Sequence, residues 1–239
     1  MKRFAFLVLF LGVNSAFADW RTADKSSAGI APSPAEEPLA VVQVYYARAY
    51  SWRGTFGVHS WIATKEANAV GYTTYHVIGW QLRRSDTSVV IQENAIPDGR
   101  WYGSEPTLLR DIRGSEAESA IAKIKAAAKE YPHGGTYHVW PGPNSNTFIS
   151  YLIRHTPEIG VELPPHAIGK DWLANYWPIG KSESNTGFQV SLYGLLGFTL
   201  GLNEGVEVNL LGLSFGLDLY RPAIKLPLAG RLGMKDEAL

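Results

Sequence analysis

The sequence has 239 residues with 12% aromatic side chains, no cysteine, and 22 basic residues against 22 acidic ones. The lack of cysteine excludes a disulfide framework and a lipid-modified cysteine, so a metal site would need histidine and carboxylate ligands. Balanced charge without a basic run of five or more residues argues against nucleic acid and anionic lipid surfaces as partners, and favours a neutral ligand or a protein partner.

The first 18 residues have the composition of a cleavable secretory signal peptide. Basic residues at positions 2 and 3 precede an apolar run, Phe4–Val13, and the small residues Ala16 and Ala18 form the pattern that a signal peptidase recognises. The apolar run is about half of the roughly 20 residues that a helix needs to cross a bilayer, and no later run is long enough either. We expect cleavage after Ala18, a periplasmic location and no transmembrane span in the mature chain, with an uncleaved anchor as the alternative.

The remaining chain divides into a linker, one domain and a short tail. Residues 19–38 are rich in serine, alanine, proline and charge and lack periodicity, which predicts a flexible linker. Residues 39–233 are numerous and aromatic enough to build one hydrophobic core, so we expect a single domain there. Residues 234–239 form the tail.

The start of the domain predicts an antiparallel meander of about four strands. Its segments are rich in β-branched and aromatic residues, and glycine or polar residues separate them. They are Leu39–Tyr50, Thr55–Thr64, Val70–Leu82 and Ser88–Gln92.

Two helices are predicted in the middle of the domain. The first begins with a capping box, in which Ser115 is the cap and Glu118 lies three residues on, and apolar residues follow at helical spacing. A short strand is expected over Thr136–Trp140. The second helix is expected over Asn144–His155, where a proline two residues later prevents its continuation.

The last third of the domain predicts a glycine-rich β-hairpin with arms Phe188–Leu200 and Val206–Leu219. Large apolar residues alternate with small ones in the second arm, so one face is apolar and the other small. The glycine face is expected to pack against another sheet or backbone; the alternative is a surface for a membrane or a subunit. Together the elements predict an α+β fold, with a mainly antiparallel sheet, two principal helices and this C-terminal hairpin.

Four segments stand out by their motifs: Gly57–Lys65, Trp140–Phe148, Ala167–Trp172 and Lys225–Gly233. They resemble an uncharacterised bacterial family known only as domain of unknown function 3750, over a span from about residue 41 to residue 233. The PGPNSNTF sequence at residues 141–148 is the most specific of these motifs. This resemblance implies a family and no activity.

A more distant resemblance, to the circularly permuted papain-like hydrolases and acyltransferases, implies a permuted papain-like core and a chemistry. Those proteins carry a histidine on an early strand and, at the start of a later helix, a cysteine within an Asn-Cys-Asn-x-Phe type of sequence. Residues 144–148 are similar to that sequence with Ser145 in place of the cysteine, and His59 lies upstream on a predicted strand. The resemblance implies Ser145 as nucleophile, His59 as general base, and the amides near Ser145 and Asn146 as oxyanion donors.

The start of a helix suits such a reaction because its free amides and its dipole stabilise negative charge. A serine hydroxyl still needs a base within about 3 Å, which we expect to be His59, with His138 as a weaker candidate. His76 on the next strand is expected either to orient His59 or to lie opposite it in the sheet. The alternatives are structural: Asn144 and Ser145 as helix caps, and His59 as a packed core histidine.

The remaining polar candidates suggest binding and surface roles. Candidate binding residues beside the nucleophile and the base are Asn144, Asn146, Trp61 and Trp140. The histidines show no metal-ligand spacing, so neither a metal nor another cofactor is expected. Glu204 and Glu207 are expected to face solvent beside the hairpin turn. Lys170 and Asp171 are expected either to form a local ion pair or to line a cleft.

Two functions follow from these observations. The first is an exported cell-envelope hydrolase or acyltransferase. The second is a catalytically inactive binding or scaffold module that holds an envelope component or a protein partner. The sequence does not indicate an oligomeric state.

Overall fold

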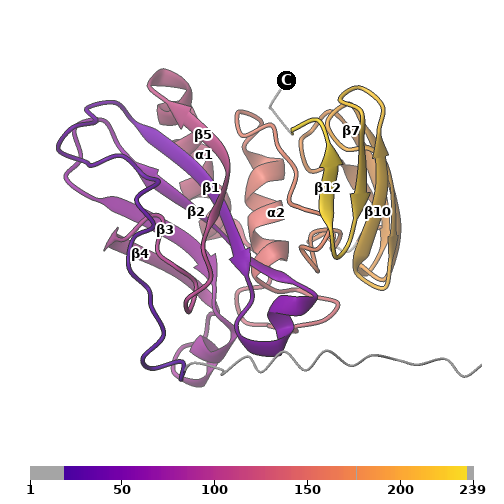
Figure 1. Cartoon of the computed structure of the whole chain (residues 1–239), viewed down its shortest axis with the longest axis horizontal. Helices are drawn as coiled ribbons and strands as arrows, with labels where there is room; N and C mark the ends of the chain where they lie inside the picture. Colours follow the sequence, from indigo (N-terminus) through magenta and orange to yellow (C-terminus); the bar gives the residue numbers. More distant parts are fainter. Residues whose placement is uncertain (1–18, 176, 236–239) are drawn as a thin grey trace, which may run out of the picture.

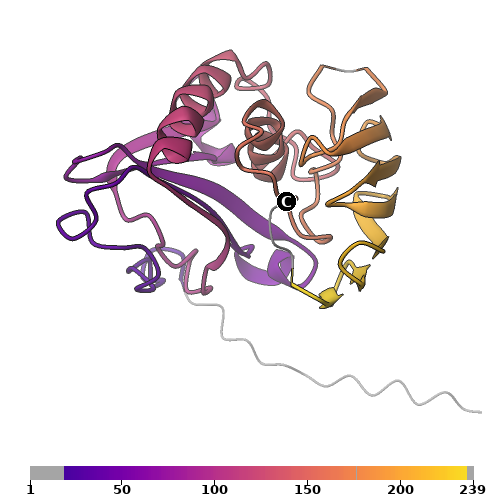
Figure 2. The ribbon, with the colours of Figure 1, turned by 90° about the horizontal axis from the view of Figure 1, so that it is seen from above.

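Two antiparallel sheets enclose a helical layer in the computed structural model, which describes residues 19–175 and 177–235 (Figure 1). The predicted signal peptide lies outside the described residues, and so do residues 236–239 of the predicted tail. The two views place the helix α2 (Ser145–His155) between the sheets (Figures 1 and 2). The predicted α+β class is confirmed.

The first sheet has five strands in the order β4-β3-β2-β1-β5. The four predicted strands are present with changed bounds, the first three shorter than predicted and β4 longer. A fifth strand that the sequence analysis missed pairs with β1 at the sheet edge. The strands are β1 (Val41–Arg48), β2 (Val58–Lys65), β3 (Tyr72–Val77), β4 (Val89–Ala95) and β5 (Thr107–Arg113). Short 3-10 turns follow β1 and β3. The turn Ser51–Thr55 lies between the first two predicted strands, and the turn Gly79–Arg83 replaces the end of the third predicted strand.

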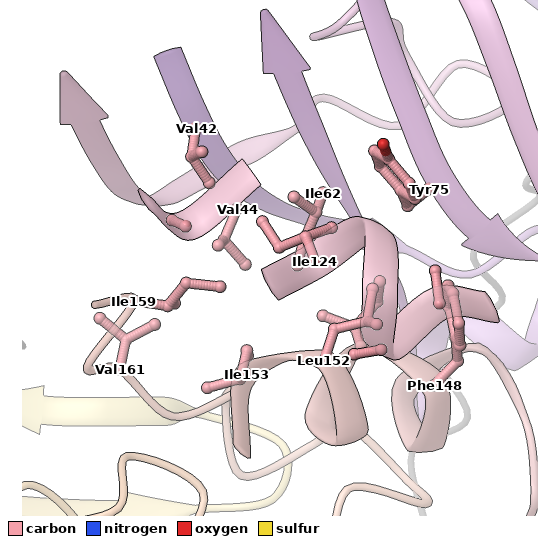
Figure 3. Close-up of a cluster of buried hydrophobic side chains, with 14 of the residues drawn as sticks. Val42, Val44, Ile62, Tyr75, Ile124, Phe148, Leu152, Ile153, Ile159 and Val161 are labelled. Atoms are coloured by element: carbon pink, nitrogen blue, oxygen red, sulfur yellow. The ribbon is translucent and has the colours of Figure 1, made fainter. Parts of the chain in front are cut away.

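Both helices pack on one face of this sheet. The helix α1 (Ser115–Glu130) turns its alanine and isoleucine stripe toward β1 and β5, and α2 contacts β2 and β3. Burial of apolar side chains on helix and strand faces drives this packing. The shared core includes Val44, Ile62, Ile124, Phe148 and Leu152, all fully buried (Figure 3).

Two local predictions in this region are wrong. Gly114, with φ 66°, occupies the N-cap position of α1, so Ser115 is the first helical residue and the predicted capping box does not form. The segment Thr136–Trp140 is irregular and contains no strand. The backbone amide of His138 donates to the carbonyl of Pro143 within the same loop. This amide is therefore not available to a neighbouring strand.

The opposite face of the first sheet is covered by the segment predicted as a flexible linker. Residues 19–38 have no regular secondary structure, yet they are held by specific contacts, because the Asp98 carboxylate accepts from the amides of Ile30 and Ala31 at 2.6 and 3.1 Å. Tyr72 Oη donates to the Pro32 carbonyl at 3.0 Å. This segment therefore closes a second, smaller core on the side of the sheet away from the helices.

The second sheet has seven strands in sequential order. Each arm of the predicted hairpin is itself a hairpin, because tight turns at residues 193–195 and 211–212 divide both arms. Three further strands extend the sheet at its edges. The strands are β6 (Ile179–Lys181), β7 (Gly187–Leu192), β8 (Leu196–Gly201), β9 (Gly205–Leu210), β10 (Leu213–Asp218), β11 (Ala223–Leu226) and β12 (Gly230–Gly233).

The second sheet turns its polar face toward the interior of the molecule and its apolar face toward the surface, the reverse of the usual arrangement. Side chains that point inward, toward α2, are small or polar, and the register aligns Gln189, Thr199 and Glu207 in one row. The large apolar side chains alternate with these residues and are exposed, so they point outward, away from α2. The glycine face thus packs inward as predicted, and the apolar face is exposed, which agrees with the alternative of an interaction surface.

Candidate functional site

The start of α2, where the sequence predicted a nucleophile, is fully engaged in structural hydrogen bonds. Asn144 is the N-cap, and its side-chain oxygen accepts from the amides of Asn146 at 2.9 Å and Thr147 at 3.3 Å. Thr147 Oγ1 in turn accepts from the Asn144 amide at 3.1 Å, which completes a capping box. The backbone N–H of Asn146 therefore donates to the helix cap, which corrects its predicted role as an oxyanion donor.

Asn146 connects α2 to the first sheet and to the loop that follows the helix. Its Oδ1 accepts from Ser60 Oγ at 2.9 Å, and its Nδ2 donates to the carbonyls of Val58 at 3.0 Å and Ile168 at 2.9 Å. The side chain is 2% exposed. A buried amide with this many partners positions three chain segments at once.

The loop around Ile168 is built to receive these side chains. Asn144 Nδ2 donates to the same carbonyl of Ile168 at 2.9 Å, and Thr147 Oγ1 donates to the Gly169 carbonyl at 2.9 Å. Gly169 has φ +96°, and a Cβ at this position would lie 2.6 Å from the Asn144 side-chain amide. Only glycine can occupy this position while Asn144 keeps its cap.

His59 and Ser145 are not brought together. Successive side chains of a strand point to opposite faces, so Ser60 points to α2 and His59 to the other side of the sheet. There the His59 ring stacks on Trp101 with ring centroids 3.6 Å apart. The five-stranded sheet thus lies between the predicted base and the predicted nucleophile.

His76 lies on the same face as His59, with the ring centroids 5.6 Å apart. Burial lowers the pKa of His76 to about 4, and burial together with the neighbouring His76 lowers the pKa of His59 well below its usual range. The Nε2 atoms of both rings are buried and have no hydrogen-bond partner among the described residues. Two neutral, packed rings therefore form an aromatic cluster with Trp101, as the structural alternative for His59 predicted.

The two tryptophans proposed for binding lie in different places. Trp61 is buried in the same aromatic cluster, where its ring stacks on Tyr45 and its Nε1 donates to the Pro97 carbonyl at 2.8 Å. Trp140 is half exposed, and its Nε1 donates to the Leu211 carbonyl at 2.9 Å, in the turn between β9 and β10. The predicted binding residues therefore do not line one common site.

A buried cluster of charges that the sequence analysis missed joins the helical layer to the second sheet. Lys170 Nζ lies 3.0 Å from Glu207 Oε2 and 3.4 Å from Glu162 Oε2. Lys225 Nζ contacts the same two carboxylates, with 3.2 Å to Glu207 Oε1. The predictions that Glu204 and Glu207 face solvent are wrong, because their residues are 1% and 2% exposed.

The alternation of two lysines and two glutamates keeps Lys170, Lys225 and Glu207 charged, because each has an opposite charge beside it. Burial alone would lower the pKa of Lys170, but Glu207 and Glu162 outweigh it and hold the pKa well above its usual range. Burial would likewise raise the pKa of Glu207, yet Lys170 and Lys225 hold it below its usual range. Paired charges of this kind are stable in a protein interior only when both partners are present.

Asp171 and Arg154 extend this network. The predicted ion pair between Asp171 and its neighbour Lys170 is not formed. Instead, Asp171 Oδ1 accepts from Gln189 Nε2 at 2.7 Å and Asp171 Oδ2 accepts from Ser214 Oγ at 3.1 Å. Arg154, on α2, donates to Gln189 Oε1 at 2.6 Å. The space enclosed within the network is about 10 Å³, no more than one water needs. The cluster therefore has no room for a substrate.

A larger hollow lies at the edge of the second sheet. Its volume is about 150 Å³, and it is lined by Leu173, Trp177, Pro178, Ser191, Leu192 and Tyr193. No charged side chain contributes to it. The hollow suits a neutral, apolar or aromatic group of a partner.

Two further observations concern metals and membranes. Residues 19–175 and 177–235 contain no group of three or more histidine, aspartate or glutamate side chains arranged to hold a metal ion. Over the same residues, no helix combines the length and the apolar character that crossing a membrane requires.

We expect Asn146→Ala to lower the free energy of unfolding by more than about 2 kcal/mol, because Ser60 and two carbonyls would lose a buried partner. Ser145→Ala, at the next position, should cost less than about 1 kcal/mol. Urea unfolding followed by circular dichroism measures both. Equal costs for the two variants would contradict the structural role assigned to Asn146.

The lowered histidine pKa values predict loss of stability in mild acid. An unfolded histidine takes up a proton as the pH falls below about 6.5, whereas folded His76 does so only near pH 4. The free energy of unfolding should therefore fall between these values, and His76→Gln should reduce the slope. Urea unfolding at pH 7, 6 and 5 tests this. An unchanged slope in the variant would mean that His76 titrates normally in the folded state.

Comparison with known proteins identifies a family and no relative of known activity. No curated protein and no solved structure matches the chain. A family model described as "Protein of unknown function (DUF3750)" matches residues 39–172, more than half of the chain. The match covers the first sheet, both helices and the loop up to Trp172, and it ends before the second sheet. The chain therefore belongs to the DUF3750 family of proteins of unknown function.

Proposed function

We propose that the protein is an exported, catalytically inactive binding or scaffold module of the cell envelope. The observation that carries this proposal is the placement of Ser145 and His59 on opposite sides of the first sheet. A serine hydroxyl titrates far above neutral pH and needs a base in hydrogen-bond reach, and the first sheet separates Ser145 from His59, the base that the resemblance implied. The hydrolase or acyltransferase hypothesis has no comparable support.

The polar groups around α2 and the second sheet favour a scaffold for a second reason. Side chains that catalysis would use, among them Asn146 and Lys170, are buried and committed to hydrogen bonds or ion pairs that join separate segments. A buried polar network that satisfies itself makes a fold rigid and specific. The side chains of Asn146 and Lys170 are therefore committed to the fold.

Binding by such a module would use uncharged surfaces. The hollow beside Trp177 and Tyr193 carries no charged side chain, which agrees with the balanced charge of the whole sequence. A neutral envelope component or an apolar segment of a protein partner fits these properties.

Labelling with a broad fluorophosphonate probe tests the absence of catalysis. We expect no labelling of the purified mature protein, because Ser145 lacks a general base. A known serine hydrolase, labelled in the same sample, is the positive control. Labelling of the wild type that both Ser145→Ala and His59→Ala abolish would restore the enzyme hypothesis.

Export has its own test, since it rests on residues 1–18 of the sequence. We expect the full-length gene product to accumulate in the periplasmic fraction of a Gram-negative host with Asp19 as its N-terminal residue, as measured by intact mass spectrometry. Ala18→Arg is the control, because a large charged residue at the cleavage position should block processing. A full-length cytoplasmic product from the wild-type gene would contradict export.

A further inference from the structure

The outward side chains of the second sheet form a continuous apolar surface, which we call the outer face. It consists of every second residue of β6–β12, and the register aligns these residues in rows that cross the sheet. One row contains Phe188, Leu200, Val206, Leu217, Ile224 and Leu232. Rows of this kind are stable in water only when another apolar surface covers them.

The outer face is large enough for a stable dimer. Seven strands about 4.8 Å apart, four of them six residues long and the others three or four, make a surface roughly 30 Å wide and up to about 20 Å long, or about 550 Å² in plan. Because the side chains make it uneven, its accessible area is larger. Stable interfaces bury about 800 Å² of accessible surface on each partner, whereas the largest apolar patches on monomers reach about 300–600 Å².

Charge restricts the identity of the covering surface. All outward positions of β6–β12 lie within the described residues. Among them, only Lys181, on the edge strand β6, has a charged side chain. The covering surface must therefore be apolar over a matching area. A second copy meets this requirement by symmetry, because a two-fold axis pairs the same patch with itself.

The centre of the outer face has a relief that a second sheet can match. Val208, on the middle strand β9, lies between Phe198 on β8 and Phe215 on β10, so a small side chain stands between two aromatic ones. These side chains are 46%, 38% and 44% exposed. Two such surfaces can interdigitate, as the inner faces of a β-sandwich do at a spacing of about 10 Å.

The edges of the sheet favour a second copy over a lipid bilayer. Within residues 19–175 and 177–235, the edge strands β6 and β12 each have one side without a strand partner. Backbone groups on that side need water or another polar partner, which hydrocarbon does not supply. In a face-to-face dimer these edges remain at the rim, in contact with water.

We propose that the outer face is a homodimer interface, in which two copies pack face to face as a β-sandwich with the two-fold axis near Val208. This interface covers the apolar side chains of both copies and leaves the DUF3750 part of each chain, residues 39–172, directed away from it. The proposal concerns a surface that catalysis at Ser145 would not use, so its test is independent of the proposed function.

The absence of cysteine allows a clean cross-linking test. Val208→Cys places a thiol at the centre of the outer face, and Ala126→Cys places one on the exposed side of α1 as the matched control. Under mild oxidation we expect disulfide-linked dimers from Val208→Cys at least tenfold faster than from Ala126→Cys. Equal rates for the two variants would overturn the proposal.

The second test measures the molar mass in solution by light scattering after gel filtration, for the mature wild-type protein and the variant Val208→Glu. We expect the mass of a dimer for the wild type and of a monomer for the variant, with unchanged circular dichroism. A monomeric wild type, or a folded variant that stays dimeric, would overturn the proposal. If Val208→Glu does not fold, the cross-linking rates decide. Flotation of a monomeric wild type with phosphatidylethanolamine and phosphatidylglycerol vesicles would assign the outer face to lipid instead.

Discussion

The buried pairing of Lys170 and Lys225 with Glu162 and Glu207 is the constraint on which the arrangement of the two sheets depends. Removing charges from water costs several kcal/mol for each ion, so none of these groups is stable in the interior without its partners. The loop after α2 supplies Lys170, and the second sheet supplies Glu207 and Lys225. The cluster therefore specifies how the sheet docks on the helical layer.

This polar interior explains the apolar exterior. Alternate residues of a strand point to opposite faces, so a strand that directs glutamate, glutamine and lysine inward must direct its other residues outward. In the second sheet those other residues are leucine, valine and phenylalanine. The exposure of these apolar residues thus follows from the inward placement of the polar ones, and exposed apolar faces of this size mark interaction surfaces.

The segment with the most distinctive sequence, PGPNSNTF, has a structural role in this fold. Asn144 and Asn146 connect the start of α2 to β2 and to the Ile168 carbonyl, and Gly169 leaves the space that Asn144 occupies. The same residue types at the start of a helix are also those that a nucleophilic site would use. Geometry separates the two possibilities here, because His59 points away from Ser145.

The sequence by itself determined the elements that depend on local periodicity: the strands β1–β4, both helices and the cap at Asn144. It could not determine the partner of β5, because strand pairing between distant segments leaves no local pattern. It also placed Glu204 and Glu207 on the surface, since both lie beside a predicted hairpin turn and turns usually face water. Only the tertiary structure decided which face of each strand is buried. His59 turns away from Ser145. The second sheet turns its polar side inward, because the ion partners of that side lie on segments distant in the sequence.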